Sequence, residues 1–101
     1  MITIGTTKHH KLKLVWIDIA GDATTDSIDD FNKMKCCEII TECFLYDVQT
    51  VDGREYVRTF ASYQVKDDIG YGDRNVYPIE VFTNESQKKI RKAWKLMSKK
   101  K

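Results

Sequence analysis

The side chains best suited to covalent or metal chemistry in this chain are three cysteines and two histidines. Cys36, Cys37 and Cys43 are odd in number and lack the paired spacing of a zinc site. Nucleophilic catalysis needs a base beside the thiol, and no histidine follows His9 and His10. Cys37 and Cys43 share one strand face and are expected to be small core residues. We therefore expect reduced thiols, no enzymatic activity, no metal site and no cofactor.

The residues predicted to bind a ligand lie on and beside a glycine-rich segment, Gly70-Tyr71-Gly72-Asp73, which is expected to be a flexible turn. Arginine can form bidentate hydrogen bonds to phosphate or carboxylate, and tyrosine offers a rigid face that stacks on a base or a partner side chain. Tyr71 has two interpretations: a contact residue held out on the turn, or a side chain folded back over the body. The candidate binding residues are Arg58, Ser62, Tyr63, Lys66, Tyr71 and Arg74.

The formal net charge of +2 conceals an uneven distribution along the chain. Residues 1–84 carry nine lysines and arginines against fourteen aspartates and glutamates, whereas residues 85–101 carry eight against one. The basic end favours an acidic partner; the alternative is a solvated helix whose lysines stabilise its C-terminal dipole. The basic residues expected to make contacts from this helix are Lys88, Arg91, Lys92 and Lys95.

The element that must position these groups is a β-hairpin between Lys35 and Tyr63. Its two arms are rich in β-branched and aromatic residues, which favour strands. Asp52-Gly53 supplies the turn, because both residues tolerate the positive φ angles of a tight hairpin. Apolar side chains occur on both faces of each arm, as expected where strands bend across a small barrel and are covered on both sides.

Shorter elements flank the hairpin in a single domain, residues 1–101. In chain order we expect a loose arm (1–10), a strand (11–20), a short helix that ends at Met34, the hairpin, a loop (64–75), a short strand (76–78), a C-terminal helix and a frayed basic tail (98–101). Asp26 or Ser27 is predicted to cap the short helix. Asn84 is predicted to cap the C-terminal helix, with Gln87 completing a capping box. The apolar face of this helix comprises Ile90, Ala93, Trp94 and Met97.

The order of these segments resembles a family of short bacteriophage proteins. The matching segments are VWIDI, IDDF, KCCEIITECFLYD, REYVRTFASY and VYPIEV, between Val15 and Ile90. The resemblance implies a mainly β (α+β) fold, a small five-stranded antiparallel SH3/Sm-like barrel with a short helix in the N-terminal half and a C-terminal helix. It also implies a non-enzymatic phage accessory protein in the cytoplasm of the infected host cell. Such a protein inhibits a host factor, often a defence system, by binding a host protein or sequestering a signalling nucleotide.

Two other functions stay open on the sequence alone. Aromatic and basic residues interleave in the hairpin and the following loop, as in small barrels that bind nucleic acid, although the acidic charge of residues 1–84 disfavours this function. Barrel edges pair readily, which would give a structural homo-oligomer. No apolar run approaches the length of a membrane span, so no membrane association is expected.

Overall fold

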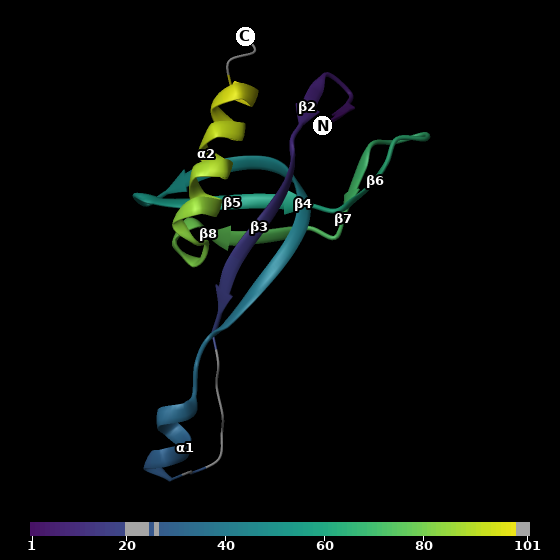
Figure 1. Ribbon diagram of the computed structural model, residues 1–101. Coiled ribbons are helices and arrows are strands. Elements are labelled where there is room, and N and C mark those ends of the chain that lie inside the picture. The colour runs from purple at the N-terminus through teal and green to yellow at the C-terminus, as the bar shows by residue number, and fades with distance from the viewer. Residues whose placement is uncertain (20–24, 26, 99–101) are drawn as a thin grey trace.

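The computed structural model describes residues 1–19, 25 and 27–98, and its centre is a four-stranded antiparallel sheet. The strands follow the order β3 (Lys11–Asp18), β4 (Cys37–Val51), β5 (Arg54–Phe60) and β8 (Asn75–Pro78). Figure 1 shows that the sheet curls strongly, so that β3 runs across the direction of β5 and β8 and the whole forms half a barrel. The prediction of a mainly β chain with two helices is confirmed.

The other described elements are two small hairpins, two α-helices and one 3-10 turn. They are β1 (Ile2–Ile4), β2 (Thr7–His9), α1 (Ile28–Lys33), β6 (Ser62–Gln64), β7 (Gly70–Gly72), η1 (Ile79–Val81) and α2 (Asn84–Ser98). Of the predicted frayed tail, Ser98 ends α2, and residues 99–101 lie outside the described part of the chain.

The prediction of the long hairpin is confirmed. β4 and β5 pair antiparallel, with Val51 opposite Arg54 at the turn. Asp52 and Gly53 take φ angles of 51° and 78°, which a two-residue hairpin turn requires. The pairing is interrupted by a bulge between Leu45 and Asp47, which the sequence pattern did not reveal. A bulge bends its strand and increases the local twist, so it contributes to the curl of the sheet.

The expected loose arm over residues 1–10 is wrong, because this segment forms the hairpin β1–β2. Ile4 lies opposite Thr7 across the turn at Gly5, whose φ is 62°. β2 contacts both β4 and α2, and Ile4 and His9 are 2% and 1% exposed. Two deeply buried side chains therefore hold the N-terminal segment in place, although its sequence has no clear alternation.

The glycine-rich segment expected to be a flexible turn also forms a strand. Gly70–Gly72 is β7, which pairs with β6 so that Tyr71 lies opposite Tyr63. A Cβ atom at Gly72 would collide with Ser62 Oγ, so a glycine here permits close approach of the two strands. Gly72 thus reflects close packing against β6, and the expectation of a flexible turn was wrong because Gly70–Gly72 pairs as a strand.

The outer edge of β3 is partly covered by the chain that follows η1. Trp16 forms an isolated bridge with Phe82, and the amide of Thr83 donates to the carbonyl of Val15 at 3.0 Å. The amide of Val15 in turn donates to Ser86 Oγ at 2.8 Å, at the start of α2. One bridge thus connects β3 to the segment that follows β8 and η1. The complete five-stranded barrel that the resemblance implies is not established.

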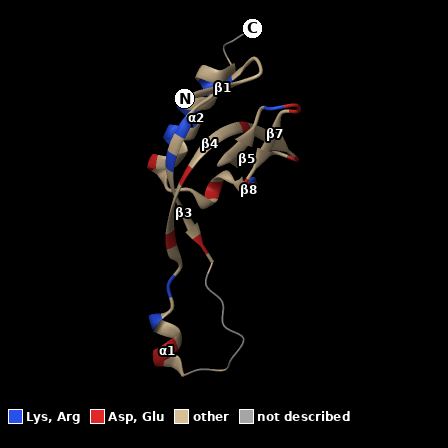
Figure 2. Ribbon diagram, turned by 90° about the vertical axis from the view of Figure 1, so that its right-hand side faces the viewer, with Lys and Arg blue, Asp and Glu red and all other residues tan. Residues whose placement is uncertain are grey.

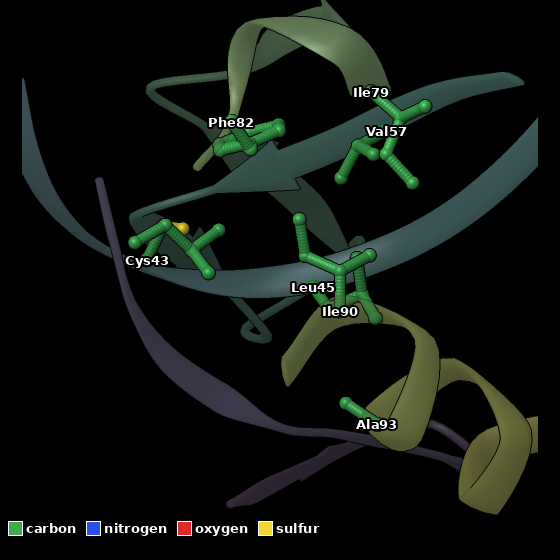
Figure 3. Packing of buried hydrophobic residues seen from close by; sticks show 8 residues of the cluster. Cys43, Leu45, Val57, Ile79, Phe82, Ile90 and Ala93 are labelled. Carbon is green, nitrogen blue, oxygen red and sulfur yellow. The ribbon is translucent and has the colours of Figure 1, made fainter. Parts of the chain in front are cut away.

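Helix α2 covers the concave face of the sheet through its apolar side. Ile90 is fully buried and Ala93 is 4% exposed. Figure 3 shows Ile90 beside Leu45 of β4, in the same cluster as Val57 of β5. The predicted apolar face of this helix is therefore confirmed, with Trp94 and Met97 packing at its margin.

The predicted cap of α2 is displaced by one residue. The amide of Ser86 donates to Thr83 Oγ1 at 3.3 Å, and the amide of Gln87 donates to the Thr83 carbonyl at 2.9 Å. Thr83, not Asn84, therefore satisfies the first free amides of the helix. The Gln87 side chain donates to the carbonyl of Phe82 at 3.0 Å, so it ties the helix to the preceding turn.

The cysteines differ in environment, and Cys37 is not the core residue that the alternation predicted. Cys36 and Cys37 are exposed, whereas Cys43 is buried. Burial raises the pKa of the Cys43 thiol to about 11, so this side chain remains a protonated thiol at neutral pH.

We expect a thiol reagent such as DTNB to label two cysteines rapidly in the native protein at neutral pH. The third thiol, Cys43, should react only after unfolding in concentrated guanidinium chloride, because it is both inaccessible and uncharged. A Cys43→Ala variant is the control: it should keep the fast phase and lose the slow one. Three fast thiols in the native protein would contradict the burial of Cys43.

Candidate functional site

A hollow of about 410 Å³ lies where β5, β7 and β8 meet the bulge of β4. Three of the predicted binding residues, Arg58, Tyr71 and Arg74, line it together. β5 supplies Arg58, β7 supplies Tyr71, and Arg74 lies between β7 and β8. Tyr46, Phe60 and Asn75 are also part of the wall.

The guanidinium of Arg58 is held by two neighbours. Its Nε donates to Asp47 Oδ1 at 2.6 Å, and its Nη2 donates to Asp47 Oδ2. Its Cζ lies 5.1 Å from the centroid of the Tyr46 ring. Hydrogen bonding to the Asp47 carboxylate raises the pKa of Arg58, so the group stays charged. The bidentate pair fixes the orientation of Arg58 and neutralises much of its charge.

Arg74 contrasts with Arg58, because it forms no ion pair with any residue in the described part of the chain. It lies in the exposed rim of the hollow. An arginine without a carboxylate partner keeps all of its donors available to a ligand. The net positive charge of the hollow is therefore concentrated at Arg74.

The floor of the hollow is a cluster of aromatic rings centred on Phe60, which is 1% exposed. The ring centroid of Phe60 lies 4.8 Å from Tyr71, 5.0 Å from His9 and 6.4 Å from Tyr46, in edge-to-face arrangements. Tyr71 therefore folds back over the body of the protein and is not held out on a turn. Burial raises the pKa of the Tyr71 phenol, so its hydroxyl stays protonated and can donate a hydrogen bond.

His9 lies behind this cluster as a buried polar support. Its Nδ1 lies 2.9 Å from the carbonyl oxygen of Leu45. Since a carbonyl oxygen accepts, Nδ1 donates the proton of this hydrogen bond. Within the described residues Nε2 has no hydrogen-bond partner. The bond to Leu45 anchors the β1–β2 hairpin directly beside the bulge that shapes the hollow.

The remaining predicted residues lie elsewhere. Ser62 and Tyr63 line a second, shallower hollow of about 400 Å³ over β6 and β7, which shares Tyr71 with the first. Lys66 lines neither hollow, and its carbonyl accepts from Gln64 Nε2 at 3.2 Å.

The four predicted contact residues of α2 are exposed and line neither hollow. Arg91 Nη1 lies 2.9 Å from Glu55 Oε1, so this residue is paired with β5. Lys88, Lys92 and Lys95 form no ion pair with the residues that the structure describes. The ten predicted residues are thus divided among the main hollow, the second hollow, the β6–β7 loop and the surface of α2.

Five wall residues were absent from the predicted site, and three of them, Phe60, Tyr46 and Asn75, show different reasons. Phe60 lies on the same face of β5 as Arg58, so strand alternation alone could have suggested it. Tyr46 depends on the bulge, which has no sequence signature here. Asn75 joins the wall only because β8 pairs with β5, where it lies opposite Thr59.

The comparisons with known proteins add no assignment, since no protein-family model, curated protein or solved structure matches the chain. Among residues 1–19, 25 and 27–98, no three histidine, cysteine or carboxylate side chains are grouped as a metal ion would require. Neither helix of the described chain is long and apolar enough to cross a bilayer.

Proposed function

We propose that this chain is a non-enzymatic binding protein whose main hollow holds a small anionic ligand with a planar ring, of the nucleotide class. The observation that carries the proposal is the convergence of Arg58, Arg74 and Tyr71 on one hollow of about 410 Å³. This volume lies within the roughly 300–1,000 Å³ typical of small-molecule sites.

The two arginines have different roles in this proposal. Arg74 has no carboxylate partner within the described chain, so it supplies the charge that binds phosphate, in a bidentate manner. Arg58 is oriented by Asp47 and stacked over Tyr46, so it offers a planar cationic surface to the ring of the ligand. The Tyr71 hydroxyl, protonated at neutral pH, donates a hydrogen bond at the same wall.

The biological role in this proposal follows from the resemblance to short bacteriophage proteins. It is a phage accessory protein that sequesters a signalling nucleotide and so inhibits a defence system of the host, in the host cytoplasm. The finer architecture belongs to the same proposal: the half-barrel is a reduced five-stranded SH3/Sm-like barrel. The single bridge at Phe82 then occupies the place of the fifth strand.

We expect the unmodified protein to retain a nucleotide in equilibrium dialysis against a panel of mononucleotides, dinucleotides and cyclic nucleotides. Arg74→Ala should weaken binding by about 10- to 100-fold, because a hydrogen bond to a charged group contributes about 1.5–3 kcal/mol. Arg54→Ala is the matched control: this arginine lies at the exposed turn of the hairpin, outside the hollow, and its loss should leave the affinity unchanged.

Three results would contradict the nucleotide proposal. Equal losses in the Arg74 and Arg54 variants would mean non-specific charge attraction. Retention of long nucleic acid only, with a steep salt dependence and loss on Lys92→Glu, would assign binding to the exposed lysines of α2 instead. Binding of a host protein with no nucleotide retained would move the function away from the hollow.

A further inference from the structure

The shape of the chain is too extended for a compact monomer. Its radius of gyration is 16.9 Å, whereas a compact domain of 100 residues has about 13 Å. It exposes 7682 Å², whereas a compact monomer of 11.8 kDa exposes about 5,900 Å². The excess of about 1,800 Å² is larger than the roughly 800 Å² that each partner contributes to a standard protein interface.

Much of this extended shape comes from the arm formed by the ends of β3 and β4 and by α1. Figure 1 shows α1 at the tip of the arm, beyond the body of the molecule. Ser27 Oγ accepts from the amide of Asp30 at 3.2 Å, as the predicted cap required, so the helix has a defined start. Yet α1 buries no residue, and its apolar side chains Ile28 and Phe31 are 79% and 70% exposed.

An isolated helix of six residues is not stable by itself, because helix nucleation costs more than so few hydrogen bonds return. Its apolar side must therefore be covered by another surface. Met34 and Ile19 also belong to the arm and are 42% and 88% exposed. Exposed large apolar side chains that are concentrated in one segment favour a contact surface there.

Charge identifies the surface that fits the arm. The described residues of the arm (18–19, 25 and 27–38) carry four acidic and two basic side chains, whereas residues 84–98 of α2 carry one acidic and five basic ones. The two net charges are opposite in sign. Figures 1 and 2 show that α1 and α2 lie at opposite ends of the molecule, so the arm cannot reach the helix of its own chain.

We propose that two copies of this chain form a closed dimer in which the acidic, apolar arm of each copy lies on the basic face of the partner's α2. A second copy supplies the complementary charge, and a two-fold arrangement uses both arms and both helices without leaving an open end. Contact between the two arms themselves is disfavoured, because it would bring like charges together. This inference concerns a surface separate from the main hollow and does not depend on the nucleotide proposal.

The test exchanges the charges of the two surfaces. The arm variant is Asp29→Lys with Glu38→Lys, which leaves the Asp30 partner of the helix cap in place. The helix variant is Lys88→Glu with Lys92→Glu, which leaves the Arg91 ion pair with Glu55 in place. All four side chains are exposed, so circular dichroism should show both variants folded. Light scattering coupled to gel filtration, at low salt and micromolar concentration, measures the mass.

We expect the unmodified protein to be a dimer and each variant alone to be a monomer, because the charge attraction between arm and helix is then lost. An equimolar mixture of the two variants should regain the dimer mass, since the unmodified arm of one chain then meets the unmodified helix of the other. Phe31→Ser should also lose the dimer without affecting the fold of the body.

Three results would overturn the proposal. A monomeric unmodified protein would mean that a second copy does not cover the arm. Loss of the dimer in the arm variant alone, with the helix variant still dimeric, would mean contact between the two arms. A dimer that persists in both variants would place the interface elsewhere, for example at the exposed edges of the half-barrel.

Discussion

Replacing Phe60 with alanine is expected to destabilise the protein by about 3–5 kcal/mol, the largest loss that we predict for a single side chain. Phe60 is 1% exposed and contacts the rings of His9, Tyr71, Tyr46 and Phe44, with centroid distances from 4.8 to 6.4 Å. Its removal leaves a cavity between three separately formed elements: the N-terminal hairpin, the β6–β7 ribbon and the main sheet. Urea unfolding followed by tryptophan fluorescence measures the change.

Two further variants separate packing from a general intolerance of mutation at this place. Phe60→Leu retains most of the buried apolar volume and should cost less than half as much. Tyr63→Ala removes an aromatic ring that is 45% exposed and should change the free energy of unfolding by no more than about 1 kcal/mol. If the alanine variants of Phe60 and Tyr63 were equally stable, Phe60 would not be the centre of the cluster.

The same variant links stability to binding. Phe60 forms part of the wall of the main hollow, and it supports Tyr71 from below. Phe60→Ala should therefore weaken nucleotide binding even at temperatures where the protein remains folded. The Arg74→Ala variant should differ from it in stability: binding is weaker, but the free energy of unfolding is unchanged, because Arg74 is exposed.

The elements that the sequence predicted well are those in which local preference and burial agree. The long hairpin has both strand-forming residues and the Asp52-Gly53 turn, and α2 has an apolar face at helical spacing. In both, the pattern is long enough for periodicity to be read. The confirmed cap at Ser27 of α1 also depends on side-chain chemistry within four residues.

The elements that the sequence did not predict depend on contacts between distant residues. His9 is buried because its Nδ1 bonds to the carbonyl of Leu45, thirty-six residues away. In β7, Gly72 lies close to Ser62 of β6, a contact that cannot be predicted from the glycine alone. The bulge beside Tyr46 is a local interruption of the strand pairing, and strand alternation contains no information about it.

The candidate site shows the same division. Arg58, Tyr71 and Arg74 were selected by residue type, and the structure brings them to one hollow because β5 pairs with β8 while β6 pairs with β7. Lys66 was selected by the same reasoning and lies outside, because the β6–β7 loop carries it beyond the hollow. Residue type indicated which side chains could bind a ligand, and strand pairing determined which of them line the same hollow.

Ile90→Ala is the second substitution with a large expected effect, about 2–5 kcal/mol of lost stability. Ile90 is fully buried in the cluster formed with Leu14, Leu45 and Val57. The intrinsic helix preference of alanine exceeds that of isoleucine by up to about 0.7 kcal/mol, so local preference alone would predict a gain. The sign of the measured change therefore shows whether α2 is stabilised by its own sequence or by contact with the sheet.

We expect packing to decide, because a helix of 15 residues is only marginally stable alone in water. Leu96→Ala is the matched control on the same helix: Leu96 is 47% exposed, and its loss should change stability by no more than about 0.5 kcal/mol. Chemical denaturation followed by far-ultraviolet circular dichroism measures both variants. If Ile90→Ala were neutral or stabilising, α2 would not be docked on the half-barrel, and the basic surface that it presents to a partner would have no fixed position.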